Sequence, residues 1–222
     1  MERQGWCDDH GCGGVTVSAA RVAPARSVLH TLGVADPFDF PALRVQQPAK
    51  FMPNHACYEI FSEHRRLLAV ATESGTQARV QLPTAPVSTD ARVLSVTTPV
   101  NEPVLTLTKR GKDRITDLRS PSGELLGQIR ATHTTRHYTL MGDQGQTVGK
   151  VVGDLALKHF SVADEAGEEF ARIRKTWAGL TKELLTPSDH YKVEFTAPVS
   201  PSARLLTVMT AIVLDLTLYG RF

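Results

Sequence analysis

Several cations of this chain gather in a few short segments, where they could bind anions. A tryptophan follows the last of them. The set comprises Lys109, Arg110, Lys112, Arg114, Arg136, Lys158, Lys175 and Trp177. Each Lys or Arg near an anionic membrane surface contributes about 1 kcal/mol to binding. We therefore predict that these residues contact the headgroups of anionic phospholipids. Solvated charges on ordinary turns are the alternative interpretation.

The sequence does not contain the usual patterns of a catalytic site. No G-x-S-x-G motif occurs, and no glycine-rich phosphate loop joins a strand to a helix. His133 and His137 are four residues apart, but the residues between them predict a turn. Their imidazoles would then not share a helical face, as metal ligands do. We expect neither a conventional hydrolase nor a transferase.

The cysteines indicate a reducing compartment. Cys7, Cys12 and Cys57 are too few for a disulfide framework, and this favours a cytoplasmic protein. His10 and His55 lie near them, but the spacing does not match a zinc knuckle. The first residues also contain no apolar segment of the kind found in a secretory signal.

Composition indicates a globular domain preceded by a leader. The chain has 222 residues, of which 41% are hydrophobic and 22% are charged, which is enough for a substantial core. Residues 1–50 are rich in Gly, Ala, Pro and Arg, and we expect them to be poorly structured. We assign residues 51–222 to the domain. A net charge of +2 gives no indication of nucleic acid, and we expect no such partner.

From about residue 56 the chain consists of short β-branched runs separated by turn residues, which predicts an antiparallel meander of strands followed by one helix. The predicted strands lie near residues 56–62, 66–72, 77–82, 92–97, 103–109, 113–119, 124–131, 136–141, 146–152, 158–163, 169–175 and 190–196.

A weak internal repeat supports the meander. Gly123, Gly145 and Gly167 recur every 22 residues, each in a strand, turn, strand unit that suits a positive φ. Arg65 occupies the glycine position of an earlier copy, so we expect that turn to differ. A small residue follows four positions after each turn glycine and would allow close approach of a strand or the helix. These residues are Gly127, Gly149 and Ala171.

Turn positions predict a separation of charge. Successive turns of a meander lie at alternate ends, so residues 120–124, 142–146 and 164–169 share one end, which is acidic. The cations named above share the other end. Arg65 and Arg66 lie near the acidic end and reduce the contrast.

The C-terminal segment predicts a helix over about 202–219. Ser200 suits the N-cap and Pro201 the first turn. Large apolar residues point all round a 3.6-residue period, so this helix must be surrounded. Its length of about 27 Å suits the axis of a small barrel.

We expect this helix to be surrounded by protein rather than by lipid. The uninterrupted apolar part, residues 205–214, is only half of the roughly 20 residues that span a bilayer. Arg204 and Asp215 bound it on either side. A buried Asp215 would need a partner, for which we expect a barrel Arg or Lys.

The last third of the chain resembles the phospholipid scramblase family and its wider Tubby C-terminal-like group, which includes the LURP-one-related proteins. Residues 170–180 resemble the family's G-x-I-x-x-x-W-x-G segment, and residues 186–195 its D-A-D-x-F-x-I-x-F strand. The helix follows in the same order, and the agreement extends over residues 56–222. The resemblance implies a closed twelve-stranded antiparallel β-barrel, mainly β, around the C-terminal helix. It also implies membrane binding at the inner face of the plasma membrane and scrambling of phospholipid between leaflets.

The proposed calcium loop of that family is degenerate here. Asp189 matches one family carboxylate, but Pro187 replaces the other and Lys192 replaces a glycine. Asp189 and Glu194 cannot supply the six to eight oxygens that calcium takes. We expect no calcium site and no cofactor.

Two classes of function remain open from the sequence. The first is a peripheral protein that binds anionic phospholipid membranes. The second is a non-catalytic barrel that binds a protein partner or has a structural role.

Overall fold

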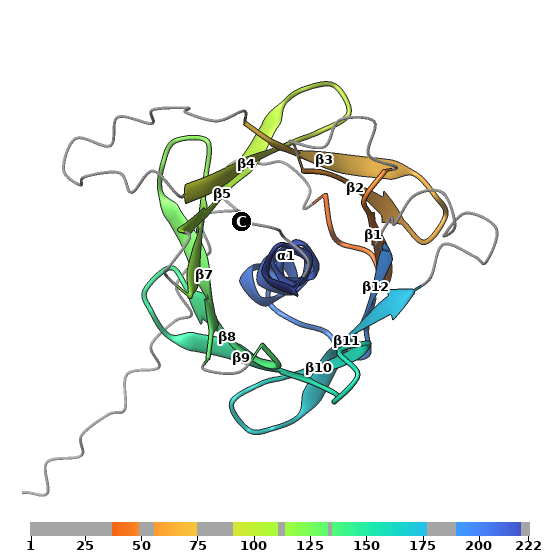
Figure 1. The fold of residues 1–222 in the computed structure, drawn as a ribbon, viewed down its shortest axis with the longest axis vertical. Helices are drawn as coiled ribbons and strands as arrows, with labels where there is room; N and C mark the ends of the chain where they lie inside the picture. The colour runs from red at the N-terminus through yellow and green to blue at the C-terminus, as the bar shows by residue number, and fades with distance from the viewer. Residues whose placement is uncertain are drawn as a thin grey trace, which may run out of the picture.

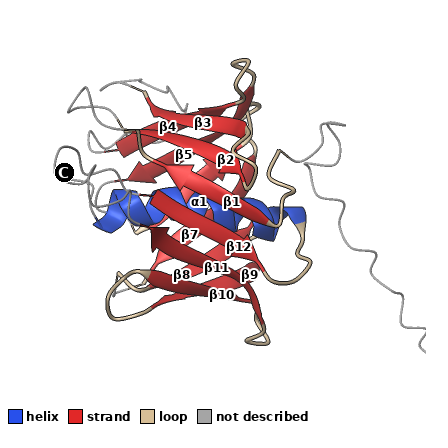
Figure 2. Cartoon of the chain, turned by 90° about the vertical axis from the view of Figure 1, so that its right-hand side faces the viewer, coloured by secondary structure: helices blue, strands red, loops and turns tan. Residues whose placement is uncertain are grey.

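The protein is a closed β-barrel with a helix inside it. The computed structural model describes residues 37–48, 56–74, 91–110, 114–132, 135–176 and 190–218. Twelve antiparallel strands pair in chain order, and β1 closes the ring by pairing with both β2 and β12 (Figure 1). The helix α1, Pro201–Leu218, lies lengthwise through the barrel (Figure 2). The predicted fold class is confirmed.

The strands are β1 Ala42–Gln46, β2 Cys57–Ser62, β3 Leu67–Glu73, β4 Ala91–Thr97, β5 Pro103–Arg110, β6 Ile115–Arg119, β7 Leu125–Ala131, β8 His137–Gly142, β9 Thr147–Gly153, β10 His159–Ala163, β11 Glu169–Thr176 and β12 His190–Phe195.

One strand was not predicted. β1 lies within the segment that we assigned to the leader, so the barrel begins before residue 51. Its five residues stand between Pro41 and Pro48, and only Leu43 and Val45 carry the alternating apolar signal.

Residues 1–36 lie outside the described residues, as does the predicted strand 77–82. Because β3 pairs directly with β4, the ring closes without that segment.

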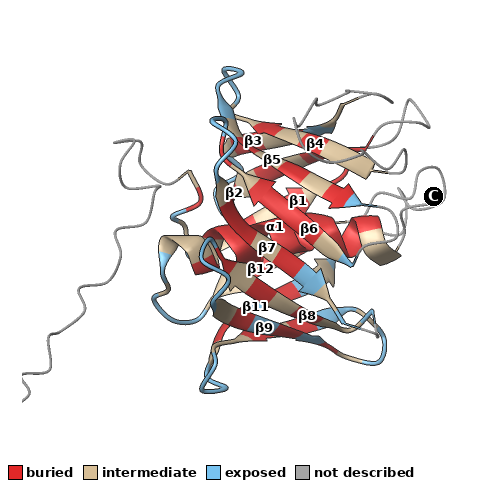
Figure 3. Cartoon of the chain, turned by 90° about the vertical axis from the view of Figure 1, so that its left-hand side faces the viewer, coloured by how far each residue is buried: buried red, intermediate tan, exposed pale blue. Residues whose placement is uncertain are grey.

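Alternation along the strands builds the core. On β5, Leu105 and Leu107 are buried while Thr106 and Thr108 are half-buried, as expected when successive side chains face opposite sides of a sheet. Inward-facing residues of the strands and the side chains of α1 form one apolar cluster. Figure 3 shows buried residues along α1 and the strands, and exposed residues mainly at the connections.

The helix is buried on all sides. Thirteen of its eighteen residues are buried, which confirms the interpretation of its all-round apolarity. Ser200 is the N-cap, with Oγ accepting a hydrogen bond from the Ala203 N–H at 3.2 Å. By length and composition α1 could cross a bilayer, but 72% of it is buried inside the barrel.

An irregular segment at the N-terminal side of β1 holds the first turn of α1. The Arg204 guanidinium donates to the carbonyl of Phe40 at 2.7 Å and lies 3.5 Å from the Asp39 carboxylate. It also stacks over Phe195, 4.3 Å from the ring centroid. Phe38 is fully buried. These contacts fix α1 along the barrel axis at this end.

The turns of the internal repeat share one hydrogen-bond pattern. Gly123, Gly145 and Gly167 all have positive φ, as predicted. Arg65 also has positive φ, at 62°, and its turn makes the same pair of backbone bonds. The expectation of a different turn was therefore wrong, because the strand pairing imposes this conformation on a residue that has a side chain.

The close approach of neighbouring elements explains why Gly127, one of the small residues of the repeat, has no side chain. A Cβ added at Gly127 would lie 2.6 Å from the Met141 carbonyl oxygen and 3.1 Å from the Leu206 side chain of α1. A side chain at this position would therefore clash with the backbone of β8 and crowd Leu206 of the helix, so glycine allows β7 to approach both.

Replacing Ile212 by alanine should lower the free energy of unfolding by about 2–5 kcal/mol, since it leaves a cavity between helix and barrel. Ile212 is fully buried. Urea denaturation followed by circular dichroism measures the change. Val100→Ala is the control, because Val100 is 73% exposed and its truncation should change stability by about 0.5 kcal/mol or less. Equal effects of the two substitutions would contradict an enclosed helix.

Candidate functional site

The antiparallel order gives the barrel two chemically different ends. We call the end where α1 begins the acidic end, and the end where α1 finishes the basic end. The acidic end contains the connections after β2, β4, β6, β8 and β10. The carboxylates in these connections are Glu63, Glu102, Glu124, Asp143, Asp164, Glu165 and Glu168. Arg65 and Arg66 also lie there, as predicted.

Four of the predicted headgroup contacts lie on the rim of the basic end. Arg110 and Arg114 flank the connection between β5 and β6, and Arg136 precedes β8. Lys158 precedes β10 and is exposed, as are Arg110 and Arg114. Arg136 is half-buried. Lys112 and Trp177 lie outside the described residues.

Two contacts position the arginines on this rim. The Arg110 guanidinium lies 3.5 Å from the Asp117 carboxylate. Arg114 Nη1 donates to the Thr132 carbonyl at 2.7 Å, which links the β5–β6 connection to the β7–β8 connection. Both guanidinium groups remain exposed to solvent.

Lys109 is not part of that outer rim. It shares the inward face of β5 with Leu105 and Leu107 and is only 8% exposed. Burial, and then the charge of Arg92 on the neighbouring strand, lower the pKa of Lys109. A side chain in this position cannot reach a planar headgroup layer, so we correct its assignment.

Lys175 also faces the interior. It pairs across the ladder with Tyr191, which is buried, and neighbours on paired strands share a face. Lys175 is half-buried at the mouth of the barrel. Successive side chains of a strand face opposite sides of the sheet, so Lys175 lies apart from the outer rim. A run of basic residues in the sequence does not reveal this difference.

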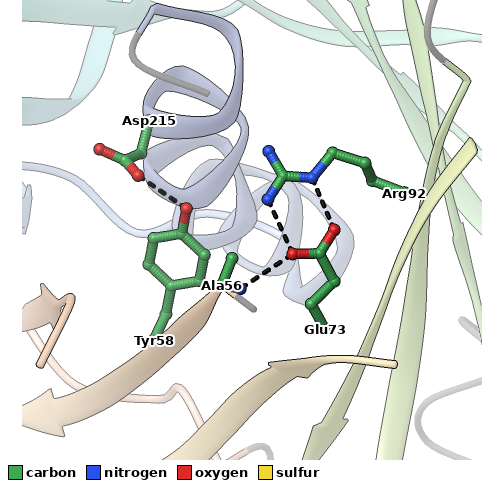
Figure 4. Close-up of polar contacts among 5 residues, drawn as sticks. All are labelled: Ala56, Tyr58, Glu73, Arg92 and Asp215. Atoms are coloured by element: carbon green, nitrogen blue, oxygen red, sulfur yellow. Dashed lines mark hydrogen bonds and ion pairs between the residues drawn. The ribbon is translucent and has the colours of Figure 1, made fainter. Parts of the chain in front are cut away.

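A polar cluster closes the interior at the basic end (Figure 4). Arg92 donates two hydrogen bonds to the Glu73 carboxylate, at 2.7 and 2.8 Å. Glu73 also accepts from the Ala56 N–H at 2.8 Å. The Tyr58 hydroxyl donates to Asp215 Oδ2 at 2.7 Å. We call Tyr58, Glu73, Arg92 and Asp215 the interior polar cluster.

Within this cluster, the Tyr58–Asp215 hydrogen bond connects the last turns of α1 to β2, and the Arg92–Glu73 hydrogen bonds connect β4 to β3. The hydrogen bonds to Glu73 raise the pKa of Arg92 and keep it charged. Burial, and then the charge of Asp215, raise the pKa of Tyr58 far above its ordinary value. Tyr58 therefore stays protonated and donates to Asp215, so each end of α1 has a polar connection to the barrel.

Sequence reasoning identified only Asp215 of this cluster. We expected a barrel Arg or Lys as its partner, whereas its hydrogen bond in Figure 4 comes from the tyrosine hydroxyl. Glu73 and Arg92 could have been found as charged residues at inward positions of β3 and β4. That signal requires the strand boundaries to be known to one residue.

The candidate calcium-loop residue that the structure describes is engaged with cations. Glu194 Oε1 accepts from Lys192 Nζ at 2.6 Å, and Glu194 Oε2 lies 3.7 Å from Arg174. The bond to Lys192 lowers the pKa of Glu194. Within the described ranges, no three His, Cys, Asp or Glu side chains lie close enough to hold a metal ion. Asp189 lies outside them.

The cysteine and histidine ligands considered above mostly fall outside the described residues too. Those outside are Cys7, His10, Cys12, His55 and His133. Cys57, at the start of β2, is a free thiol, and burial raises its pKa.

The dependence of stability on alkaline pH tests the interior polar cluster. Unfolded tyrosine ionises near pH 10, whereas Tyr58 in the folded state resists ionisation, and burial raises the pKa of Tyr138 to about 12. Above pH 10 the unfolded chain therefore binds fewer protons, and the free energy of unfolding falls as pH rises. Tyr58→Phe should make this fall less steep, by up to about 1.4 kcal/mol per pH unit.

The same variant should lose about 1–3 kcal/mol at pH 8, because Asp215 loses a buried donor. Urea midpoints at pH 8, 10 and 11 measure both effects. An unchanged alkaline slope would show that Tyr58 is not buried as described.

Comparison with known proteins agrees with this architecture. No curated protein sequence matches the chain significantly. Among solved structures, the X-ray structure of a protein from Arabidopsis thaliana superposes with a TM-score of 0.50 and 14% identity, over 85% of this chain and 98% of that chain. At this identity the similarity concerns the fold. A family model described as Scramblase matches residues 88–221, which is more than half of the chain. The chain therefore belongs to the scramblase family.

Proposed function

We propose that this scramblase-family protein binds anionic phospholipid membranes peripherally through the rim of its basic end. The observation that carries the proposal is the separation of charge along the barrel axis. Arg110, Arg114, Arg136 and Lys158 lie at one end, and the carboxylate-rich turns lie at the other. Family membership supports association with a phospholipid membrane.

This separation favours one orientation on a membrane. At about 1 kcal/mol per cation near an anionic surface, the four rim residues would contribute about 4 kcal/mol. The acidic end would be repelled by the same surface. The cytoplasmic leaflet of the plasma membrane carries a negative surface potential, and its inner face is therefore the membrane that we propose.

The helix is proposed to stay inside the barrel during binding. Eight large apolar side chains of α1 are buried: Leu205, Leu206, Val208, Met209, Ile212, Val213, Leu214 and Leu216. A bilayer could accommodate them, but the inward-facing side chains of the strands would then meet water. Loss of that core would exceed the 5–15 kcal/mol that typically stabilises a domain. Binding to the surface requires no such rearrangement.

Scrambling is the finer activity that the family suggests, and it can be measured separately from binding. Purified full-length protein is mixed with vesicles of phosphatidylcholine and phosphatidylserine that carry a fluorescent lipid in both leaflets. Flotation reports binding, and the fraction of fluorescence that dithionite quenches reports transfer between leaflets. Quenching beyond the outer-leaflet half would establish scrambling. A protein that does not float with the vesicles would instead fit the alternative of a protein-interaction module.

Charge reversal of the rim tests the proposed orientation. Arg114→Glu with Lys158→Glu should weaken binding to these vesicles by about 30-fold or more, since two cations contribute about 2 kcal/mol. Arg65→Glu with Arg66→Glu is the matched control, because it alters net charge equally at the acidic end. Charges beyond a Debye length of about 8 Å are screened at physiological salt, so the control should change binding about twofold or less. Equal losses in both variants would reject an oriented contact.

Calcium should have no specific site on this protein. Isothermal titration of the protein with calcium chloride, without vesicles, should show no binding tighter than about 1 mM, the weak limit of protein calcium sites. Glu194 is already paired with Lys192 and Arg174, which leaves its oxygens poorly placed for a cation. A stoichiometric site in the micromolar range would contradict this prediction.

A further inference from the structure

Large apolar side chains exposed on the described residues are few, and two of the three are only three residues apart in the chain. Leu155 is 87% exposed in the turn between β9 and β10, and Val152 is 48% exposed on β9. Val100 is 73% exposed in the turn between β4 and β5. Because alternate turns lie at opposite ends, Leu155 projects from the basic end and Val100 from the acidic end.

Hydrogen bonds hold the turn that carries Leu155. Asp154 Oδ1 accepts from the Lys158 N–H at 2.8 Å and the His159 N–H at 3.3 Å. Asp154 Oδ2 lies 3.0 Å from His159 Nδ1. The Asp154 side chain therefore adds to the backbone hydrogen bonds Asp154 N–H to His159 O and Leu157 N–H to Asp154 O, which also close the turn.

The backbone of this turn adopts a conformation that leucine rarely takes. Leu157 has a φ of 55° and its side chain packs against the core. A positive φ costs a residue with a side chain free energy. The consequence is that Leu157 points inward while Leu155, two residues earlier, points into solvent.

Cations accompany the two exposed apolar residues. Lys150 precedes Val152 by two residues on the same exposed face of β9, and Lys158 follows Leu155 in the turn. Cations beside a projecting leucine match the chemistry of a bilayer surface, where anionic headgroups lie above acyl chains.

We propose that Leu155 inserts into the acyl region of anionic phospholipid membranes, with Val152 at the headgroup boundary. The barrel would then dock with its β9–β10 side tilted toward the bilayer rather than standing evenly on its basic rim. This inference rests on the proposed function and adds an apolar contact to it. The ligand is the bilayer itself, without recognition of a single headgroup.

Paired substitutions at opposite ends test the insertion. In flotation of the full-length protein with vesicles of phosphatidylcholine and phosphatidylserine, Leu155→Ser should weaken partitioning roughly tenfold or more. The dependence of partitioning on salt should stay the same, because no charge changes. Val100→Ser, which removes an apolar side chain that is also largely exposed but lies at the acidic end, should bind as the unmodified protein does.

A fluorescent probe measures insertion directly. Leu155→Trp should shift its emission to shorter wavelength on vesicles and be quenched by lipids brominated in the acyl chain. Val100→Trp should show no change beyond that of the native tryptophans Trp6 and Trp177, which contribute the same background to both variants.

The outcomes separate the two proposals. If Arg114→Glu with Lys158→Glu abolishes binding while Leu155→Ser binds normally and Leu155→Trp is not quenched, the charged contact stands and insertion is overturned. If the unmodified protein does not bind anionic vesicles at all, both proposals are overturned.

Discussion

The burial of an all-round apolar helix inside the barrel is the constraint on which the rest of this structure depends. A twelve-stranded ring encloses a lumen that short side chains from the strands alone would not fill. The helix α1, with thirteen buried residues, fills it. Neither the helix nor the barrel can bury its apolar surface without the other. At Gly127 a Cβ would lie only 3.1 Å from the Leu206 side chain, which shows how closely helix and barrel are fitted.

Polar contacts at both ends decide where the helix sits along the barrel axis. Arg204 binds the irregular segment before β1, and Asp215 accepts a hydrogen bond from Tyr58 on β2. Sliding of the helix would break these contacts, and a buried charge without its partner is costly. The interior thus needs no further ligand to be filled, and the membrane contact that we propose uses the outer rim. The rim's charges follow from the meander, because every second connection returns to the same end.

Much of the architecture could be predicted from the sequence. Apolarity all round residues 205–214 predicted an enclosed helix, and the 22-residue recurrence of Gly123, Gly145 and Gly167 predicted the turns. The predictions that were wrong concern residues whose local sequence pattern is ambiguous. β1 is short and flanked by prolines, and Lys109 belongs to a basic run whose members face opposite sides of the sheet. Tyr58 and Asp215 are 157 residues apart, so no local pattern could have paired them.

Amide hydrogen exchange read by mass spectrometry, with and without anionic vesicles, tests the enclosed helix most directly. An enclosed helix exchanges only when the whole barrel opens, so residues 205–214 should be as protected as the central strands. Vesicles should leave the protection of both helix and strands unchanged. Faster exchange in the helix than in the strands in solution would contradict the account. So would a loss of strand protection on vesicles, because it would show that the helix leaves the barrel to enter the bilayer.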